Sequence, residues 1–209
     1  MSTSRQNKEI SVTKAFYEKN AEQWVHSHGD PFHDEKEFRI LAKYLSPRAS
    51  VLDIGCAGGV LVPLFLGIGR DFRYHGIDIA KNFIAIAKRR YPQLPFTVGN
   101  LVDKTTLPRK KFDAFIARSV IMHLPLEQWD VAFKNIEDIS KSKSYGYIVL
   151  PERRPPSLNP TEDYRHFTLL SEKEQISFMK KRGWKIVKKF TRDQGPGKAH
   201  WIGYIVQLP

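Results

Sequence analysis

Cysteine is nearly absent from this sequence, because Cys56 is its single cysteine in 209 residues. One cysteine excludes an intrachain disulfide and a multi-cysteine zinc site. No apolar run approaches the roughly 18 residues that a membrane-spanning helix requires. The N-terminal stretch MSTSRQNKEI is polar and lacks the apolar core of a signal peptide. We therefore expect a cytoplasmic protein with no membrane partner.

Acidic residues are also scarce, with 22 Asp and Glu against 34 Lys and Arg, a net charge of +12. Residues 141–209 hold 14 basic and 6 acidic residues, which is 8 of that surplus. Such a basic half suits contact with nucleic acid or with an acidic substrate. A solvated, solubilising surface is the simpler interpretation, because few aromatic residues interrupt the Lys and Arg runs.

Internal repeats and low-complexity segments are absent as well, and the length suits one domain. We expect three parts: helices that cover a cofactor over 1–46, a cofactor-binding core over 47–150, and an acceptor-side loop with the final strands over 151–209. Within the first part, we expect weak order over 1–12 and amphipathic helices over 13–24 and 38–45.

From residue 49 onward, strand and helix patterns alternate with short links. We expect strands over 49–54, 72–79, 95–100, 112–120, 145–150, 184–190 and 200–208. Helices are expected over 60–69, 81–92, 126–140 and 171–183. This alternation predicts an α/β fold with a doubly wound, mostly parallel sheet of about seven strands and helices on both faces. The last two strands have no helix between them and should form an antiparallel pair at one edge.

The stretch VLDIGCAGGV ends a buried strand on a carboxylate, Asp53, and then breaks into glycines. Small residues such as Gly55 let the backbone approach a ligand closely, and the following helix offers free N–H groups. A second acidic residue, Asp78, ends the next strand, where a carboxylate can accept hydrogen bonds from both hydroxyls of a ribose. This arrangement predicts a nucleoside-containing ligand.

A dinucleotide is the first alternative, but the pattern argues against it. The dinucleotide motif requires glycine or alanine where this chain has Val60. Asp53 also lies where a pyrophosphate would be repelled.

The motifs instead resemble those of the class I S-adenosylmethionine-dependent methyltransferases, small-molecule branch, which have a Rossmann-like fold. DIGCAGG is similar to their first motif, GIDIA to the second and FTVGNLVD to the third. FDAFIARSVIMHLP resembles the strand and loop beside the methionine end of the cofactor, and FYEKNAEQW resembles the covering helix. These motifs keep their order and spacing over residues 51–125.

The resemblance implies S-adenosylmethionine as the cofactor and S-adenosylhomocysteine as its product. It places Asp53 near the methionine ammonium, Asp78 on the ribose and Asn100 at the adenine amine. The residues expected to bind the cofactor are Tyr17, Trp24, Asp53, Gly55, Cys56, Ala57, Gly59, Asp78, Ile79, Phe83, Asn100, Leu101, Arg118 and Ser119.

Several of these residues have a second interpretation. Ala57 replaces a family glycine, which the loop tolerates if φ there is negative. Asn100 replaces the usual aspartate and also suits a local Asx turn. We interpret Cys56 as a small buried residue rather than a nucleophile. Phe83 could also pack in the core formed by its helix.

The acceptor is less well indicated. The chain lacks the Pro-Pro-aromatic motif of base-amine methylation, a second cysteine for base C5 chemistry and the paired glutamates of arginine methyltransferases. We therefore expect a small-molecule acceptor and no metal, with RNA methylation or a non-catalytic binding module as alternatives. His123 is the candidate catalytic residue, although a structural hydrogen bond would explain it equally well. The acceptor-side candidates are Arg153, Arg154, Tyr164, Arg165, His166 and His200.

Overall fold

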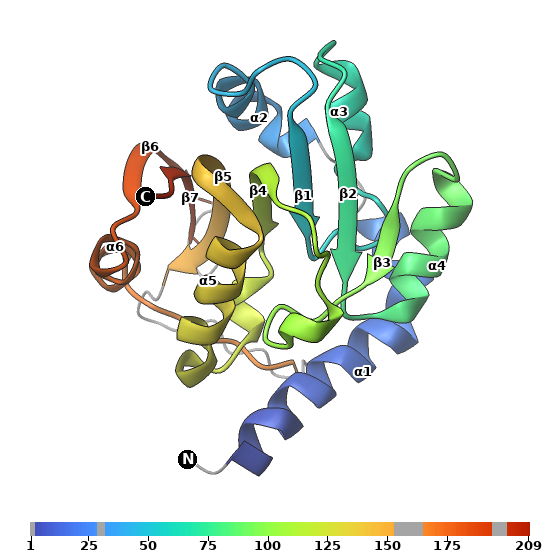
Figure 1. Cartoon of the computed structure of the whole chain (residues 1–209). Helices are drawn as coiled ribbons and strands as arrows, with labels where there is room; N and C mark the ends of the chain where they lie inside the picture. Colours follow the sequence, from blue (N-terminus) through green and yellow to red (C-terminus); the bar gives the residue numbers. More distant parts are fainter. Residues whose placement is uncertain (1–2, 29–31, 153–164, 194–199) are drawn as a thin grey trace.

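The computed structural model describes residues 3–28, 32–152, 165–193 and 200–209 (Figure 1). Its α-helices are α1 Thr3–Ser27, α2 Glu35–Ala42, α3 Val62–Gly67, α4 Lys81–Arg90, α5 Trp129–Asp138 and α6 Glu172–Lys181. Short 3₁₀ turns are η1 Phe32–Asp34, η2 Lys104–Thr106, η3 Ile121–His123 and η4 Leu126–Gln128. The strands are β1 Ser50–Ile54, β2 Arg73–Asp78, β3 Phe96–Val98, β4 Phe112–Arg118, β5 Ser140–Glu152, β6 Lys185–Asp193 and β7 His200–Gln207.

The seven strands form one sheet in the order β3-β2-β1-β4-β5-β7-β6. All neighbouring pairs are parallel except those of β7, which runs antiparallel to both β5 and β6. The strand order reverses between β1 and β4, and in sheets of this kind a crevice for ligands opens there, beyond the carboxyl ends of the strands. The predicted α/β fold is confirmed.

Two apolar clusters fill the space between the sheet and its helices. One joins alternate sheet residues such as Leu52 and Phe115 to Phe133 of α5 and Met179 of α6. The other joins Val51 and the intervening positions to α2, α3 and α4. Strand side chains alternate between faces, so β1 contributes Val51 to one cluster and Leu52 to the other. Helices therefore cover both faces, as the sequence predicts.

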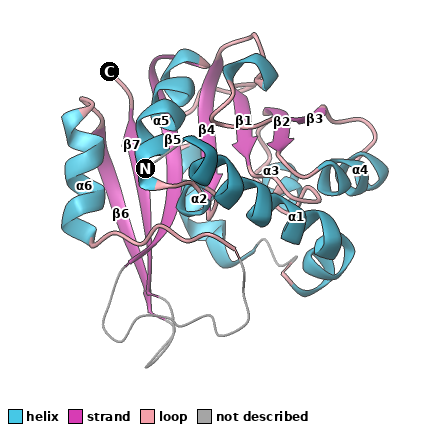
Figure 2. Ribbon diagram, turned by 90° about the horizontal axis from the view of Figure 1, so that it is seen from below, coloured by secondary structure: helices cyan, strands magenta, loops and turns pink. Residues whose placement is uncertain are grey.

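Helix α1 crosses the carboxyl ends of the strands (Figures 1 and 2). It packs on α4 through Ala21, which joins Ala80, Phe83 and Ile86 in a small buried cluster. The helix begins at Thr3, so residues 3–12, for which we expected weak order, are helical, and residues 1 and 2 lie outside the described residues. No glycine or proline interrupts residues 3–27, and tertiary packing on α4 stabilises what the sequence pattern shows only from residue 13.

The last two strands form the expected antiparallel pair at one edge of the sheet. Within that pair β7 lies between β5 and β6, so β6 is the outermost strand at this edge. The burial of Ile202, Tyr204 and Val206 fits an internal strand, whereas β6 alternates with exposed lysines.

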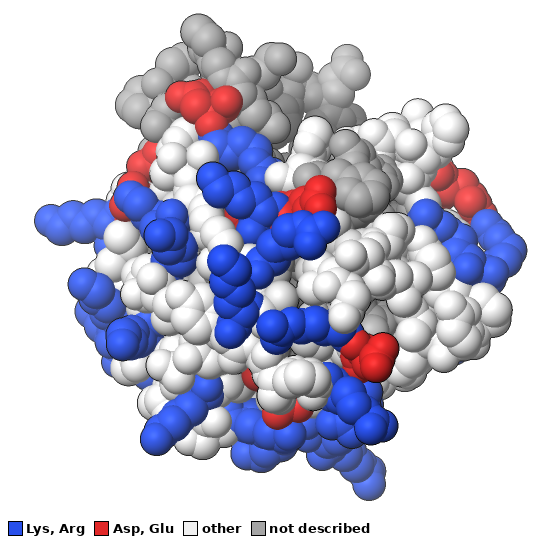
Figure 3. Space-filling model, turned by 90° about the horizontal axis from the view of Figure 1, so that it is seen from above, with Lys and Arg blue, Asp and Glu red and all other residues white. Residues whose placement is uncertain are grey.

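No helix in the described part of the chain is both long enough and apolar enough to cross a bilayer. The face of the molecule at the amino ends of the parallel strands carries many Lys and Arg side chains, as Figure 3 shows. This face lies at the opposite end of the parallel strands from α1.

Candidate functional site

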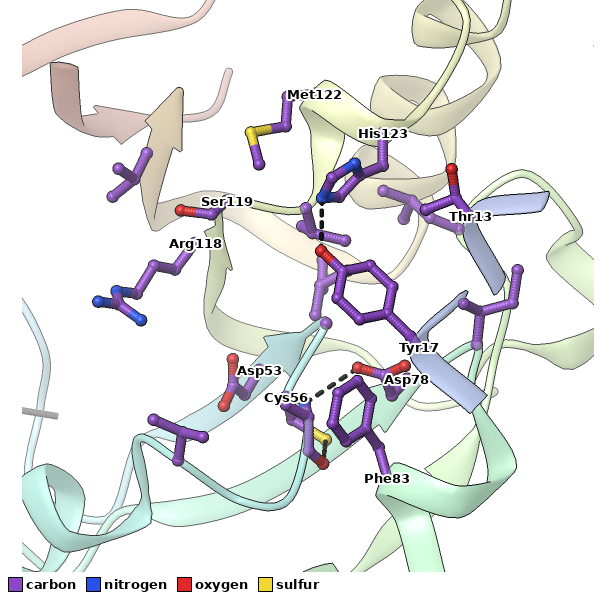
Figure 4. Close-up of a pocket in the computed structure, with 18 of the residues that line it drawn as sticks. Thr13, Tyr17, Asp53, Cys56, Asp78, Phe83, Arg118, Ser119, Met122 and His123 are labelled. Carbon is purple, nitrogen blue, oxygen red and sulfur yellow. Dashed lines mark hydrogen bonds between the residues drawn. The ribbon is translucent and has the colours of Figure 1, made fainter. Parts of the chain in front are cut away.

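A cavity of about 800 Å³ lies between the carboxyl ends of β1, β2 and β4 and the covering helix α1. Figure 4 shows Asp53 and Asp78 on one side of it and His123 on another, with Tyr17 between them. The predicted residues that line it are Tyr17, Trp24, Asp53, Gly55, Cys56, Ala57, Asp78, Ile79, Phe83, Asn100, Leu101, Arg118, Ser119, His123 and Arg165. Residues from four separate motifs therefore meet in one cavity.

The glycine turn after β1 requires its small residues. Gly55 has φ +73°, and an added Cβ would lie 2.8 Å from the side chain of Val120. The N–H groups of Gly55 and Cys56 both donate to the carbonyl of Ile77, at 2.8 and 3.0 Å. These bonds hold the turn against the end of β2 and bring the two strand ends together.

Ala57 adopts φ +48°, so the negative φ that was the condition for tolerating alanine in this loop is not found. Its N–H donates to Asp78 Oδ2 at 2.9 Å, a charge-assisted bond that offsets the cost of the left-handed backbone. Gly59, which we expected to bind the cofactor, does not line the cavity. Its N–H donates to the Cys56 carbonyl at 3.0 Å and closes the turn.

Asp78 is 8% exposed and makes backbone contacts on both carboxylate oxygens. Oδ2 accepts from Ala57, and Oδ1 accepts from the N–H of Ala80 at 2.9 Å. Burial raises the pKa of Asp78 to about 6, despite these hydrogen bonds, which lower it. The side chain therefore links the glycine turn to the start of α4 and presents a preorganised acceptor to the cavity.

Asp53 is 1% exposed at the end of β1. The hydroxyl of Tyr74 donates to its Oδ2 at 2.8 Å. Burial raises the pKa of Asp53 to about 7, while the Tyr74 hydrogen bond and the charge of Arg118 act in the opposite direction. An ionised carboxylate here is costly until a cation pairs with it, which suits a site for an ammonium group.

These two carboxyls give the ligand-free protein a testable pH dependence. A carboxyl whose folded pKa lies above its unfolded value binds more protons in the folded state, so its contribution to stability is lost as pH rises, here through about 4–7. His75, whose pKa burial lowers to about 4, acts in the opposite direction between about 4 and 6.5. The comparison must therefore isolate one carboxyl.

We expect Asp53→Asn to gain free energy of unfolding relative to the wild type as pH rises from 5 to 8. The reason is that only the wild type must ionise a buried carboxyl over that range. Urea denaturation at several pH values measures the difference, with Asp71→Asn on the exposed surface as the matched control. A difference that stays constant across pH would show that Asp53 titrates as in the unfolded chain.

Asn100 follows β3 and forms a local turn, since its Oδ1 accepts from the N–H of Val102 at 3.2 Å. Its own N–H donates to Thr106 Oγ1 at 2.8 Å, and Asn135 on α5 fixes the carbonyl of Leu101 at 2.8 Å. Asn100 and Leu101 nevertheless line the cavity. The turn and the ligand-facing position are thus compatible.

Aromatic side chains form the wall contributed by α1. The rings of Tyr17 and Trp24 meet edge to face at 5.2 Å, and Tyr17 lies 5.7 Å from Phe83 of α4. Trp24 also stacks on His28 at 3.8 Å. Phe83 is 2% exposed and belongs to the cluster that holds α1 on α4, so it serves the core as well as the cavity wall.

A directional chain of hydrogen bonds joins the two halves of the cavity. His123 Nδ1 lies 2.8 Å from the carbonyl of His166, which can only accept, so a neutral His123 carries its proton on Nδ1. Nε2 is then an acceptor for the Tyr17 hydroxyl at 2.8 Å. Tyr17 in turn accepts from Arg165 Nη1 at 2.7 Å. Neighbouring groups therefore determine the tautomer of His123, which is 7% exposed.

Arg165 also contacts four aromatic rings. Its guanidinium carbon lies 4.8–5.3 Å from the ring centroids of Phe16, Tyr17, Trp24 and Phe167. Cation–π contacts of this kind stabilise a desolvated guanidinium. They fasten residues 165–168 between α1 and the loop after β4.

A second basic group lines the cavity away from α1. Arg118 Nε lies 2.5 Å from Oδ2 of Asp34, which is 0% exposed. Arg192 Nη2 lies 3.3 Å from Oδ1 of the same carboxylate, and the Tyr147 hydroxyl donates to that oxygen at 2.9 Å. One buried carboxylate thus positions two guanidinium groups at the cavity wall. Of this group the sequence patterns singled out only Arg118, as a cofactor-binding residue, because the group joins residues 34, 118, 147 and 192.

Two predicted acceptor-side histidines lie outside the cavity wall. His166 donates its N–H to Thr13 Oγ1 at 2.9 Å, and its Nε2 contacts Thr168 Oγ1 at 2.9 Å. His200 begins β7, with Nδ1 3.0 Å from Glu152 Oε2. Arg153, Arg154 and Tyr164 lie outside the described residues. Among the described residues, no three His, Cys, Asp or Glu side chains are grouped to hold a metal ion.

Comparisons with known proteins agree with this geometry. Residues 51–143 match the family model described as a methyltransferase domain. The curated protein named Putative methyltransferase 235L, from Invertebrate iridescent virus 6, is 26% identical over 142 residues. Those residues are 68% of this chain and 47% of that protein, so this chain spans about half the length of that relative.

Solved structures show the same fold at low identity. The 1,6-didemethyltoxoflavin-N1-methyltransferase of Burkholderia thailandensis, crystallised with 1,6-didemethyltoxoflavin and S-adenosylhomocysteine, is 15% identical. It superposes with a TM-score of 0.78, covering 97% of this chain and 90% of its own. The magnesium protoporphyrin IX methyltransferase of Synechocystis PCC 6803, crystallised with S-adenosylmethionine, is 16% identical with a TM-score of 0.65, covering 85% of this chain and 79% of its own.

Proposed function

We propose that this chain, which carries a class I S-adenosylmethionine-dependent methyltransferase domain, transfers a methyl group to a small polar organic acceptor. The observation that carries the proposal is the covered cavity of about 800 Å³, with Asp53 and Asp78 at one side and His123 at another. Helix α1 and residues 165–168 close over it. A cavity covered in this way favours a small acceptor over a polymer such as RNA.

The residues present fit S-adenosylmethionine, which supplies a methyl group already activated on a sulfonium when it is bound. Gly55 lets the turn adopt a positive φ and lie against Val120 at the cavity wall, where a Cβ would clash. Asp53 would pair with the methionine ammonium, because its buried carboxylate makes no ion pair with any residue of the described chain. Asp78 would accept from the ribose hydroxyls, and Asn100 from the adenine amine. An ammonium partner for Asp53 would explain why β1 finishes on an acid.

Proton handling falls to His123 in this proposal. An acceptor hydroxyl must lose its proton as its oxygen attacks the methyl carbon, whereas an ammonium must lose a proton beforehand, because it has no lone pair. His123 Nε2 is the unprotonated nitrogen, and the Tyr17 hydroxyl already donates to it. The acceptor's proton would pass to the Tyr17 oxygen as the Tyr17 proton moves to Nε2. The rest of the rate enhancement would come from the orientation of the acceptor and from the exclusion of water by α1.

Acceptor recognition is proposed for the guanidinium groups of the cavity wall. Arg118 and Arg192 are held there by Asp34, and Arg165 by its aromatic neighbours. Guanidinium groups suit a polar or anionic acceptor. The expected roles of Arg153, Arg154 and Tyr164, the three-part division of the chain and the cytoplasmic location stay predictions.

The test has two stages. S-adenosylhomocysteine at 100 times its dissociation constant should stabilise the protein by about 2.7 kcal/mol, an increase in Tm of a few degrees, and NAD should not. A methyl-transfer screen over small hydroxyl, amine and thiol compounds then identifies the acceptor. Stabilisation by NAD alone would contradict the cofactor assignment. Cofactor binding without turnover on small molecules, but with turnover on RNA, would favour the polymer alternative.

A further inference from the structure

A cluster of cations lies on the face opposite the cavity, at the amino ends of the parallel strands (Figure 3). We define this basic face as Lys43, Arg48, Arg70, Arg73 and Lys143. Arg73 Nε donates to the Arg48 carbonyl at 3.0 Å. Arg70 Nη1 donates to two carbonyls at the end of α2, at 2.9 and 2.7 Å, which places it beside Lys43. Three segments distant in sequence, around residues 43–48, 70–73 and 143, thus converge here.

The charges of the basic face are not balanced by acidic partners. Elsewhere on the surface, several cations pair with carboxylates, as in Lys104–Asp138 at 2.6 Å and Lys189–Glu172 at 2.5 Å. None of the five cations of the basic face makes an ion pair with a described residue. The acidic groups nearby are Asp71, between Arg70 and Arg73 in sequence, and Asp113, which pairs with Lys141 at 2.7 Å.

An exposed aromatic ring lies within the basic face. Tyr44 is 40% exposed, the one aromatic residue among the large hydrophobic side chains that are exposed in the described chain. Its ring stacks on Tyr145 at 5.0 Å with an interplanar angle of 25°. Lys43 precedes Tyr44, and Lys143 lies two residues before Tyr145, so cations flank the stacked pair. Tyr145 therefore packs on one face of the Tyr44 ring, and the Tyr44 side chain remains partly open to solvent.

The backbone at two of the cations is unusual. Arg48 and Lys143 have φ of 62° and 58°, a region that non-glycine residues enter at an energetic cost. Lys143 is fixed on both sides, because its N–H donates to the Pro209 carbonyl at 3.2 Å and its carbonyl accepts from Gln207 at 3.4 Å. Strained positions that carry exposed charge point to a role in binding.

We propose that the basic face binds single-stranded nucleic acid, with phosphates on its five cations and a base stacked on the free side of Tyr44. Cationic grooves with an aromatic platform are the recurring design of single-strand binding sites. A duplex offers no unstacked base to Tyr44. A membrane surface would require inserted apolar side chains, and Tyr44 is the one exposed large hydrophobic residue of this cluster. The basic face lies at the amino ends of the parallel strands and the cavity at their carboxyl ends, so this binding is separate from the proposed methyl transfer.

Fluorescence polarisation with a labelled 12-nucleotide single strand tests the proposal, in RNA and DNA arms of one sequence and a duplex arm. We expect both single strands to bind more tightly than the duplex. With about five phosphate contacts, log K should fall with log salt concentration at a slope near −3.5. Tighter binding of RNA than of DNA would indicate a further contact to the 2′-hydroxyl. Equal binding of the two would indicate that the basic face binds single strands of either kind.

Charge and stacking are then tested separately. Lys43→Gln with Lys143→Gln should reduce the salt slope by about 1.4, whereas the matched pair Lys8→Gln with Lys19→Gln on α1 should not change it. Tyr44→Ala should weaken binding at least about fivefold at an unchanged slope, and Tyr44→Phe should bind like the wild type. Circular dichroism confirms that each variant is folded.

Three results would overturn the proposal. The first is no binding of any single strand at 50 mM salt. The second is an equal loss from the α1 pair, which would mean diffuse attraction to the net charge. The third is binding to anionic phospholipid vesicles but not to the oligonucleotides.

Discussion

Replacing His123 with alanine is expected to slow methyl transfer to a hydroxyl or ammonium acceptor by about 10²–10⁴-fold. The physical reason is that Nε2 is the unprotonated ring nitrogen, set by the Nδ1 contact to the His166 carbonyl, and it contacts the Tyr17 hydroxyl at 2.8 Å. Affinity for S-adenosylhomocysteine should stay within about threefold, since the cofactor groups assigned above bind elsewhere. Steady-state kinetics and calorimetry measure the two quantities.

His166→Ala is the matched control for His123→Ala. Its backbone carbonyl, which orients His123, remains, and its side chain does not line the cavity. We expect near wild-type turnover from His166→Ala. Tyr17→Phe should lower kcat. Tyr17→Ala should lower kcat and also weaken cofactor binding. If His123→Ala kept full turnover on an acceptor that must lose a proton, His123 would be a structural hydrogen-bonding residue only.

The second large effect is expected at Asp78. Asp78→Asn should weaken S-adenosylhomocysteine binding at least about 100-fold, because two hydrogen bonds to a charged group are worth about 1.5–3 kcal/mol each. An amide has one acceptor oxygen, so it cannot serve Ala57, Ala80 and the ribose together. Isothermal titration calorimetry well below the Tm of the variant separates lost affinity from lost stability.

A cofactor analogue completes that experiment. The 2′,3′-dideoxy form of S-adenosylhomocysteine should bind the wild type weakly and lose little further affinity in Asp78→Asn, since both changes remove the hydrogen bonds between the ribose hydroxyls and Asp78. Asp71→Asn, on the exposed surface, controls for the removal of a charge. Additive losses from the two changes would show that Asp78 acts on the glycine turn and not on the ribose.

The sequence by itself determined the α/β alternation, the glycine turn and the two acidic strand ends. Each of these is local: a strand of about six residues, a tight turn and a helix start are specified by neighbours in sequence. Asp53, Gly55 and Asp78 could therefore be placed at the carboxyl edge of the sheet before any coordinates were known. The order of the motifs predicted the cofactor for the same reason.

Only the tertiary structure decided how the cavity is closed and how its polar groups pair. Tyr17 meets His123 across 106 positions, and Arg165 meets Tyr17 across 148. The left-handed Ala57, the internal position of β7 and the full length of α1 also depend on distant partners. No local pattern encodes such contacts, because their free energy comes from burial and hydrogen bonding between segments that meet only once the sheet has formed.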